Sequence, residues 1–395
     1  MMWKTNKLGN LVRRKIGYGV VQPGASLPSG VPIIKVNNII AGLTNVDALD
    51  KTSKEIECQY QRTRLHGGEL VISLVGSVGN TAIVPPSHKG CNLVRATGLI
   101  DIEDPMLTKW VKYYIDSPKG QNYIKENLNT TVQATLNIKS LVEMPIPLPN
   151  PRTLDQIVSV LSSLDDKIEN NNRINVNLEA QAQALFKSWF IDFEPFGGVM
   201  PEDWSEGTIS ELVDLLNGFA FKSSDFVANG IYKLITIKGV QDGKMSADGA
   251  DCLDIIPAKM PQWCLLQKGD ILLSLTGNVG RCCLVDMDHC LLNQRVAKLQ
   301  PKTEYTRLFV YTLFRQEEMK SRMISIARGT AQMNLSPIET GKLSTIVPSE
   351  EILANFGKRY NGILDIILNN ISENQRLATL RDTLLPKLMK GEIEL

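Results

Sequence analysis

The sequence has few of the residues from which disulfide frameworks, metal sites and catalytic sites are built. Its 395 residues include three histidines and seven cysteines, and the cysteines form no CxxC pair. An odd number of scattered cysteines is typical of reduced thiols in a cytosolic protein. One cluster of possible metal ligands exists, namely Cys282, Cys283, His289 and Cys290. With so few histidines, we predict no catalytic residue, no bound metal and no cofactor in this chain.

Long apolar runs and familiar catalytic motifs are also absent. No segment reaches the roughly 18 apolar residues of a membrane-spanning helix. The first seven residues, Met-Met-Trp-Lys-Thr-Asn-Lys, lack the apolar core of a signal peptide, so we expect a cytoplasmic protein. The sequence has no P-loop, no GxGxxG motif and no Asn/Asp-Pro-Pro-aromatic tetrapeptide. These absences favour a binding and positioning protein over an enzyme.

The chain also has no large excess of charge of either sign, because its net charge is only +1. A protein that holds nucleic acid by bulk electrostatics carries a large positive excess. Any nucleic-acid-binding face of this chain must therefore be a local patch.

The strongest positive signal is an internal repeat, in which residues 204–296 resemble the first 95 residues at an offset of 201. The aligned positions are Trp3 with Trp204, Leu11 with Leu212, Gly17 with Gly218, 73–79 with 274–280, and Asn92 with Asn293. The shared glycines indicate backbone positions that admit little else. The intervening residues differ widely, which predicts one scaffold that carries two different surfaces. At the cysteine cluster, the offset of 201 aligns Cys283 with Ala82, which argues against a metal site.

A long amphipathic helix is predicted after the first repeat, over residues 153–190. It begins with Thr-Leu-Asp-Gln, a capping-box pattern in which Thr153 and Gln156 satisfy free amides. Its predicted length is about 57 Å. Ten positions recur at alternating spacings of four and three, as in the seam of a coiled coil. They are Ile157, Leu161, Leu164, Ile168, Asn171, Asn175, Leu178, Ala182, Leu185 and Trp189.

The same seam recurs 199 residues later. Its positions are Phe356, Tyr360, Ile363, Ile367, Asn370, Asn374, Leu377, Arg381, Leu384 and Leu388. Matching stripes predict that the two helices pack on each other, and a two-fold relation between the repeats requires an antiparallel pair. This places Asn171 near Asn374 and Asn175 near Asn370, where paired amides avoid a cost of about 1–3 kcal/mol. The alternative is that each helix packs alone on its own globular domain.

Each repeat is predicted to be a mixed α/β domain. Short buried strands are expected at 69–75, 82–86, 270–275 and 282–285, and helices at 108–127 and 305–325. The predicted fold class is α+β, with two repeated mixed α/β domains, each followed by a long helix, and an antiparallel coiled coil of the two helices. The predicted segments are a first repeated domain (1–150), a central helix and linker (151–198), a second repeated domain (199–348) and a C-terminal helix (349–395).

Basic and polar residues at loop ends of both repeats are the candidate DNA contacts. Each residue alone is more simply interpreted as solvated surface, but the set suits a DNA-facing edge. The candidates are Arg13, Arg14, Lys15, Arg62, Arg64, Ser77, Asn80, Lys222, Asn278, Arg281, Gln294 and Arg295. The repeated SxxGxxG motif is interpreted mainly as a hairpin turn. A backbone-amide contact with a DNA phosphate is the second interpretation.

Several strings together resemble the specificity subunits of type I restriction–modification systems. They are Ala184-Leu-Phe-Lys-Ser-Trp-Phe-Ile-Asp-Phe-Glu-Pro195, Pro201-Glu-Asp-Trp204, Gly218-Phe-Ala-Phe-Lys-Ser and Leu385-Pro-Lys-Leu-Met-Lys-Gly391. The resemblance covers the whole chain, including the order of two recognition domains with a long helix after each. In the first domain, Gly17-Tyr-Gly-Val departs from the Gly-Phe-Ala-Phe string.

The resemblance implies a non-catalytic subunit of a prokaryotic complex. Each target-recognition domain would read one half of a bipartite double-stranded DNA target. The helices would set the spacer and dock two methyltransferase subunits that carry S-adenosylmethionine, and restriction subunits that use ATP and Mg²⁺ would join them. Two alternatives stay open from the residues alone: a repeat enzyme that binds a nucleotide or small ligand, and a coiled-coil scaffold protein.

Overall fold

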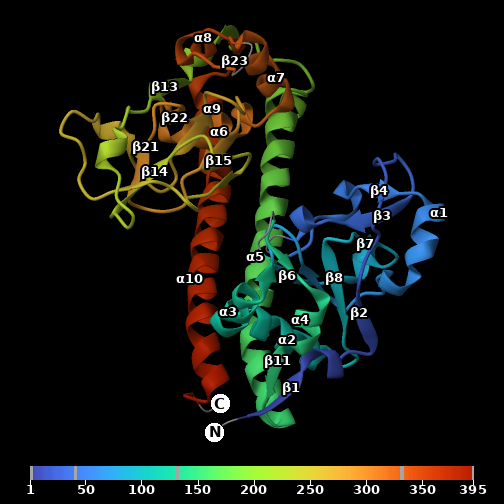
Figure 1. The fold of residues 1–395 in the computed structure, drawn as a ribbon. Coiled ribbons are helices and arrows are strands. Elements are labelled where there is room, and N and C mark those ends of the chain that lie inside the picture. The colour runs from blue at the N-terminus through green and yellow to red at the C-terminus, as the bar shows by residue number, and fades with distance from the viewer. Residues whose placement is uncertain (1–2, 40–41, 130–132, 330–332, 394–395) are drawn as a thin grey trace. The chain divides into compact units, whose positions relative to one another are not determined.

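The computed structural model describes residues 3–39, 42–129, 133–329 and 333–393, and it divides into two compact units (Figure 1). Unit 1 contains Met1–Asp166 and Leu377–Leu395, and unit 2 contains Lys167–Arg376. Each unit combines one repeat with a section of both long helices. This contact-based division cuts the long helices, which the predicted segments keep whole.

Unit 1 is built on a four-stranded antiparallel sheet of order β2-β8-β5-β6, with a second sheet of order β4-β3-β7. Two further pairs are β1-β11 and β10-β9. The strands are β1 (Lys4–Lys7), β2 (Arg14–Tyr18), β3 (Val31–Ile34), β4 (Lys51–Thr52), β5 (Leu70–Ser73), β6 (Thr81–Ile83), β7 (Asn92–Leu93), β8 (Thr97–Asp101), β9 (Leu128–Asn129), β10 (Thr135–Leu136) and β11 (Pro145–Leu148). The helices of the repeat are α1 (Lys54–Glu57), α2 (Pro105–Asp116), α3 (Pro118–Glu126) and α4 (Ile138–Glu143).

Unit 2 repeats this topology with a main sheet of order β13-β22-β19-β20 and a second sheet of order β17-β14-β21-β18. The remaining pairs are β12-β23 and β15-β16. The strands are β12 (Ser205–Thr208), β13 (Val213–Asn217), β14 (Tyr232–Ile235), β15 (Val240–Gln241), β16 (Lys244–Met245), β17 (Cys252–Leu253), β18 (Leu265–Leu266), β19 (Ile271–Ser274), β20 (Cys282–Leu284), β21 (Cys290–Leu292), β22 (Val296–Pro301) and β23 (Ser344–Val347). The helices of the repeat are α6 (Arg307–Phe314), α7 (Glu317–Ile326) and α8 (Pro337–Gly341).

The internal repeat is therefore a repeat of structure. In both units the second sheet contains one parallel pair, β3 with β7 and β14 with β21. The predicted strands correspond to β5, β6, β19 and β20. The predicted helices at 108–127 and 305–325 are each broken in two. In the first repeat the break falls at Ser117, whose hydroxyl accepts from the Gly120 amide, and Pro118 cannot continue the preceding helix.

The repeat offset changes within each domain, which corrects two of the predicted alignments. Val20 N donates to Leu93 O at 2.6 Å, and Phe219 N donates to Leu292 O at 2.9 Å, so the partner of Gly218 is Gly19 rather than Gly17. A Cβ at Gly19 or Gly218 would lie 2.0 or 2.1 Å from a neighbouring carbonyl oxygen, which explains both glycines. An irregularity in β2 supplies the offset change.

The second correction concerns the buried Asn92. Because Ile34 pairs with Leu93 and Ile235 pairs with Leu292, Asn92 corresponds to Leu291 and not to Asn293.

The two long helices are α5 (Pro151–Phe190) and α10 (Gly362–Lys390), the latter preceded by α9 (Glu350–Tyr360). Helix α5 begins two residues before the predicted start. Asn150 Oδ1 accepts from Thr153 N at 2.9 Å, so Asn150 caps the helix and Pro151 takes the first position. The predicted capping box at Thr153 is therefore wrong.

The predicted C-terminal helix is interrupted at Asn361. The Asn361 side chain accepts from Leu308 N at 3.0 Å and donates to Glu304 O at 2.9 Å. It thereby satisfies the first turn of α6, which joins the long helix to the second repeat.

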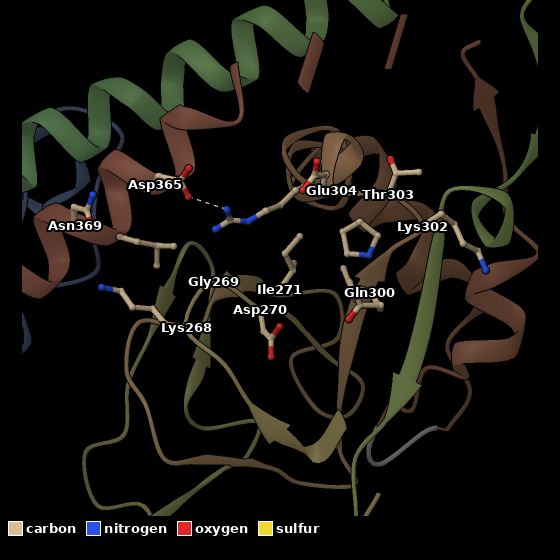
Figure 2. Close-up of a pocket in the computed structure, with 14 residues that line it drawn as sticks. Lys268, Gly269, Asp270, Ile271, Gln300, Lys302, Thr303, Glu304, Asp365 and Asn369 are labelled. Atoms are coloured by element: carbon tan, nitrogen blue, oxygen red, sulfur yellow. Dashed lines mark hydrogen bonds and ion pairs between the residues drawn. The ribbon is translucent and has the colours of Figure 1, made fainter. Parts of the chain in front are cut away.

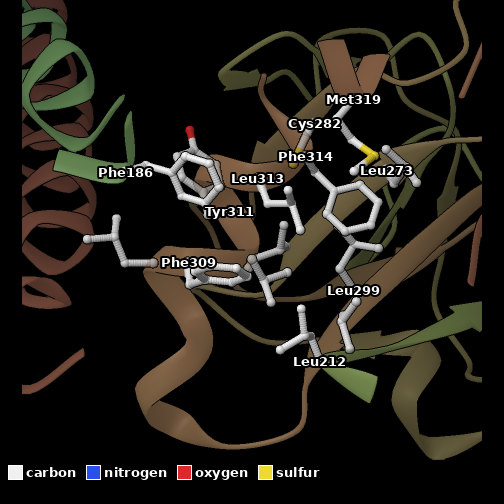
Figure 3. Close-up of a cluster of buried hydrophobic side chains, with 14 of the residues drawn as sticks. Phe186, Leu212, Leu273, Cys282, Leu299, Phe309, Tyr311, Leu313, Phe314 and Met319 are labelled. Carbon is white, nitrogen blue, oxygen red and sulfur yellow. The ribbon is translucent and has the colours of Figure 1, made fainter. Parts of the chain in front are cut away.

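Each unit has a core to which both long helices contribute. In unit 2, Phe186 and Phe190 of α5 lie 5.2 and 4.7 Å from Phe309 of α6, and Trp189 lies 5.4 Å from Phe356 of α9, all between ring centroids. Figure 3 shows Phe186 and Phe309 beside Tyr311. Each fully buried aromatic side chain contributes about 1.5–3 kcal/mol. The aromatic string at the end of the central helix is thus a core element.

In unit 1, Ile157 and Leu161 of α5 share a core with Leu385 and Leu388 of α10 and with Trp110 of α2. The sections of the two helices in each unit therefore pack on each other as well as on the repeat. The alternative of two separately packed helices is excluded.

Candidate nucleic-acid interface

Each SxxGxxG turn is closed by hydrogen bonds of its own serine side chain. Ser73 Oγ donates to Ser77 O and accepts from Asn80 N at 2.9 Å, and Ser274 makes the same two bonds with Asn278 and Arg281. The amides of Gly76 and Gly79 donate to Ala134 O and Ser73 O. These donors are occupied, so the turns have the geometry of hairpins and not of phosphate cradles.

Some of the arginines predicted to contact DNA in the first repeat instead form ion pairs within the domain. Arg13 Nη2 lies 2.9 Å from Asp101 Oδ1, and Arg14 contacts both Asp101 and Glu69, the latter at 2.8 Å. The Asp101 and Glu69 side chains are only 2% exposed. Burial raises the pKa of Asp101, but the bonds from Arg13 and Arg14 outweigh it and lower that pKa overall. Removal of either arginine would leave a buried carboxylate without an ion-pair partner.

Arg64 is held in the same way. Its Nε donates to Glu57 Oε1 at 2.8 Å, and the buried Asn92 donates to the same oxygen at 3.0 Å. The hydrogen bond from Arg64 is the main reason that the pKa of Glu57 is lowered. Glu57 thereby joins α1 to β7, and Arg64 is the ion-pair partner of its carboxylate, a role that the position of Arg64 at a loop end does not reveal.

The second repeat leaves more of its candidates at the surface. Gln294 and Arg295 are exposed in the turn between β21 and β22, and Lys222 is exposed after β13. Arg281 is half-buried, and its Nη1 donates to Gln241 Oε1 at 2.5 Å. These residues come from three loops of one domain.

The remaining candidates are also exposed. They are Lys15, Arg62, Ser77, Asn80 and Asn278. Within the described part of the chain, only Asn80 among these five has a side-chain hydrogen bond, which it donates to Ile39 O at 3.3 Å. The structural partner of Gln294 in the first repeat is Arg95, because Arg95 N and Gln294 N make equivalent bonds to Val20 O and Phe219 O. Arg95 is exposed, and the offset of 201 conceals this correspondence.

The predicted seam positions of both helices are buried or half-buried. At the centre of the seam, the predicted asparagine partners are hydrogen-bonded. Asn171 Nδ2 donates to Asn374 Oδ1 at 2.9 Å, and Asn370 Nδ2 donates to Asn175 Oδ1 at 2.8 Å. The order of these two bonds shows directly that the sections of α5 and α10 in unit 2 run antiparallel.

Arg381, the one clear break in the apolar seam, has a partner on the opposite helix. Its Nη1 lies 2.7 Å from Asp165 Oδ1, and Tyr113 of α2 donates to the other Asp165 oxygen at 2.6 Å. The side chains of Asp165 and Arg381 are less than a third exposed. One ion pair therefore joins α5, α10 and the first repeat within unit 1. The sequence pattern marks Arg381 as an anomaly but gives no indication of Asp165.

Unit 2 contains an open pocket of about 680 Å³ between the main sheet and α10 (Figure 2). Arg307 lies 2.8 Å from Asp365, and Lys302 lies 2.5 Å from Asp214, so two cations near this pocket already have acidic partners. The third cation, Lys268, donates to the Ser372 hydroxyl, and the carboxylates of Asp270, Glu304 and Asp365 also line the pocket, which disfavours a nucleotide phosphate.

The cysteine cluster is divided between two cores. Cys282 belongs to the core with α6, whereas Cys283 and Cys290 belong to the core under the second sheet. Burial raises the pKa of Cys290 to about 12, which disfavours the thiolate that binds metals. The described residues contain no group of three His, Cys, Asp or Glu side chains that could hold a metal ion. Over the same residues, no helix has the length and apolarity needed to span a membrane.

Comparison with known proteins gives a consistent result over most of the chain. The family described as "Type I restriction modification DNA specificity domain" matches twice, over residues 3–180 and 201–381. Each match spans one repeat and much of the long helix after it. The repeating unit is therefore a domain together with its helix.

Individual relatives agree with the family match. The chain is 26% identical over 329 residues to the type I restriction enzyme HindI specificity subunit of Haemophilus influenzae, covering 65% of this chain and 71% of that protein. It is 25% identical over 308 residues to the MjaIX specificity subunit of Methanocaldococcus jannaschii, covering 74% and 70%. The fold is similar to that of a type I S subunit from M. genitalium, with a TM-score of 0.55, 17% identity and coverage of 98% and 96%.

Proposed function

The chain belongs to the family of type I restriction–modification DNA specificity subunits, and we propose that each repeat reads one half of a bipartite target in double-stranded DNA. It is a non-catalytic component of such a system. One observation carries the proposal: two domains share a strand order, yet different side chains occupy equivalent loops. A common scaffold with divergent loops suits two readers of different sequences.

In the second repeat, the proposed reading surface comprises Lys222, Asn278, Arg281, Gln294 and Arg295. Arginine, glutamine and asparagine can bond base edges in two places at once, and lysine neutralises phosphates. Gln294 and Arg295 are exposed and adjacent in one turn, so a partner can reach both. This surface needs no excess of positive charge over the whole chain.

In the first repeat, the equivalent surface comprises Lys15, Arg62, Ser77, Asn80 and Arg95. All five residues are exposed. We exclude Arg14 and Arg64 from base contacts, because their guanidinium groups hold buried carboxylates. Their contribution to reading is indirect, through the framework that presents the loops.

We propose that the long helices set the distance between the two repeats and form the docking site for partner subunits. They would fix the spacer between the half-targets and dock two methyltransferase subunits, and restriction subunits would join that complex. S-adenosylmethionine, ATP and Mg²⁺ would bind those partners and not this chain. The DNA and these partners imply the cytoplasm of a prokaryotic cell.

Methylome sequencing of a host that carries this subunit with its methyltransferase tests the proposal. The expected result is one methylated motif made of two specific halves around a spacer of fixed length. An added arm inserts four residues after Asn172, about one helical turn or about 6 Å. That insertion should lengthen the spacer by one or two base pairs and leave both halves unchanged. A contiguous motif, or a spacer that ignores the insertion, would contradict the proposal.

A further inference from the structure

The seam between α5 and α10 contains charges that break its internal symmetry. An offset of 199 relates the two helices, and it converts the pair Asn171–Asn374 into the pair Asn370–Asn175. Both of these bonds exist, so the offset describes the real geometry of the seam. The asparagines fix the register but treat the two helices alike.

Two ion pairs across the seam distinguish α5 from α10. Asp165 and Lys167 lie on α5, and Arg381 and Glu373 lie on α10. Asp165 lies 2.7 Å from Arg381, within unit 1, and Lys167 lies 3.3 Å from Glu373, within unit 2. Glu373 also accepts from Asn171 at 2.7 Å, and this bond, followed by that from Lys167, lowers the pKa of Glu373.

The positions related to these four charges by the repeat are all apolar. Asp165 corresponds to Leu364, Lys167 to Ile366, Arg381 to Ala182 and Glu373 to Ile174. Leu364 and Ala182 are fully buried in the core of unit 2. The two halves of the pseudo-symmetric seam therefore differ, with two ion pairs in one half and apolar residues at the equivalent positions of the other.

We infer that these charges select the partner of each helix, so that α5 pairs with α10 and neither helix pairs with its equivalent from a second copy of the chain. In a pair of two α5 helices, Asp165 would face Ala182 and Lys167 would face Ile174. In a pair of two α10 helices, Arg381 would face Leu364 and Glu373 would face Ile366. Every charge would lose its partner, whereas the asparagine layer would still be satisfied. Charges beside an apolar seam are known to set partner choice in coiled coils.

This selection would have a consequence for the proposed reading function. The apolar stripes of α5 and α10 are alike, so apolar packing alone permits pairs of identical helices between two chains. Such pairs would bring two copies of the same reader together and create a symmetric target. The ion pairs would favour pairing of α5 with α10 of the same chain, so that one helix pair carries the two different repeats. Helix pairing is a property of assembly that can be measured without DNA. Partner selection by charge can therefore be disproved while the proposed DNA-reading function stands.

The first test is a charge reversal in the full chain. We define the α5-reversed chain by Asp165→Arg and Lys167→Glu, and the α10-reversed chain by Glu373→Lys and Arg381→Asp. Each should melt roughly 5 °C or more below the natural chain, because like charges then face each other. The chain with all four substitutions should regain at least half of that loss. Asp166→Arg, at an exposed neighbouring position, is the control for added charge. A fourfold variant that melts no higher than either reversed chain would overturn the inference.

The second test asks for partner exchange. The α5-reversed and α10-reversed chains, with different tags, are expressed together and analysed by native mass spectrometry. Because each helix then matches only the other chain, a one-to-one heterodimer should exceed the heterodimer of two tagged natural chains at least fivefold. An equal amount in the two experiments would overturn partner selection by charge.

A third variant tests the exclusion of identical helices. It replaces each charge by its counterpart in the repeat: Asp165→Leu, Lys167→Ile, Glu373→Ile and Arg381→Ala. This chain should stay folded and form concentration-dependent dimers beyond those of the natural chain. A control with Asp166→Ile and Arg376→Ile adds apolar surface at exposed positions. If the variant dimerises no more than the natural chain, or no more than the control, the exclusion is disproved.

Discussion

The two repeats use their basic residues differently although their main sheets have the same strand order. In the first repeat, Arg14 and Arg64 lie against carboxylates that are 2% exposed. In the second repeat, Lys222 and Arg295 are exposed at loop ends. The fold therefore does not dictate where charge is used, and the role of an arginine cannot be carried from one repeat to the other by position.

The difference has a structural source in β8 and β22. Asp101 ends β8 and is buried under Arg13 and Arg14, whereas the equivalent strand carries the exposed Gln300. The second repeat places its framework ion pairs elsewhere, between Lys298 and Asp270 at 2.8 Å and between Arg315 and Glu179 of α5 at 3.2 Å. The two repeats therefore differ in where their framework ion pairs lie.

The largest expected effect comes from Arg14→Met. It leaves Asp101 without one of its partners and Glu69 without its ion pair, at a cost of about 3 kcal/mol, the lower end for a buried pair. The measurement is the free energy of unfolding from chemical denaturation. Lys15→Met, at an exposed position in the same strand, should change it by less than about 0.5 kcal/mol. Equal effects of the two substitutions would show that the first repeat does not rely on its arginines.

The asparagine layer is the place where the two repeats should behave alike. Asn171→Leu leaves Asn374 Oδ1 without its donor and should cost about 1–3 kcal/mol. Asn370→Leu removes the equivalent bond and should also destabilise. Replacing all four asparagines by leucine should raise the melting temperature above both single variants, because no amide is then left unpaired. A fourfold variant less stable than Asn171→Leu would show that the layer stabilises the helix pair as well as fixing its register.

In the second repeat the same kind of substitution should affect binding instead of stability. Arg295→Ala should weaken DNA binding by about 1–3 kcal/mol if Arg295 reads a base, and should flatten the salt dependence if it contacts a phosphate. Arg281→Ala should act in the same direction. A salt titration of DNA affinity measures both, with Arg376→Ala on the long helix as the control. Unchanged affinity in both variants would remove these arginines from the interface.

The smallest effect is a pH dependence that arises from Asp286 in the second repeat. Burial raises the pKa of Asp286 from 3.8 to about 6, although Lys244 and Lys268 oppose the shift. The folded state disfavours the ionised carboxyl, so this group should lower stability as pH rises from about 4 to about 6, with no further change above that. The equivalent position in the first repeat is Pro85, which cannot titrate. Thermal melts of Asp286→Asn should lose this part of the pH profile; an identical profile would refute it.

Much of the architecture could be predicted from the sequence because it depends on periodicity. The alternating spacing of four and three gives the seam, and the recurrence of Asn171, Asn175, Asn370 and Asn374 gives the antiparallel register. The seam follows from helix geometry, and the antiparallel register also needs the two-fold relation between the repeats. Fixed-spacing arguments fail where the chain gains residues, as in the irregularity of β2 that makes Gly19 the partner of Gly218.

The candidate interface was harder to predict because ion pairs join residues far apart in the sequence. Arg14 and Asp101 are 87 positions apart, and Asp165 and Arg381 are 216 apart. Loop-end position identifies exposed residues such as Lys222 and Arg295 correctly, but it cannot separate them from Arg14 or Arg64. Only the carboxylates that the fold brings to those arginines decide their role.

The central claim is that the two repeats read DNA independently, and exchanging one repeat tests it most directly. Residues 199–348 are replaced by the corresponding domain of a specificity subunit with another target, and the methylome of the host is sequenced. The account predicts a new sequence in one half of the methylated motif, with the other half and the spacer unchanged. A change in both halves, or in neither, would contradict it.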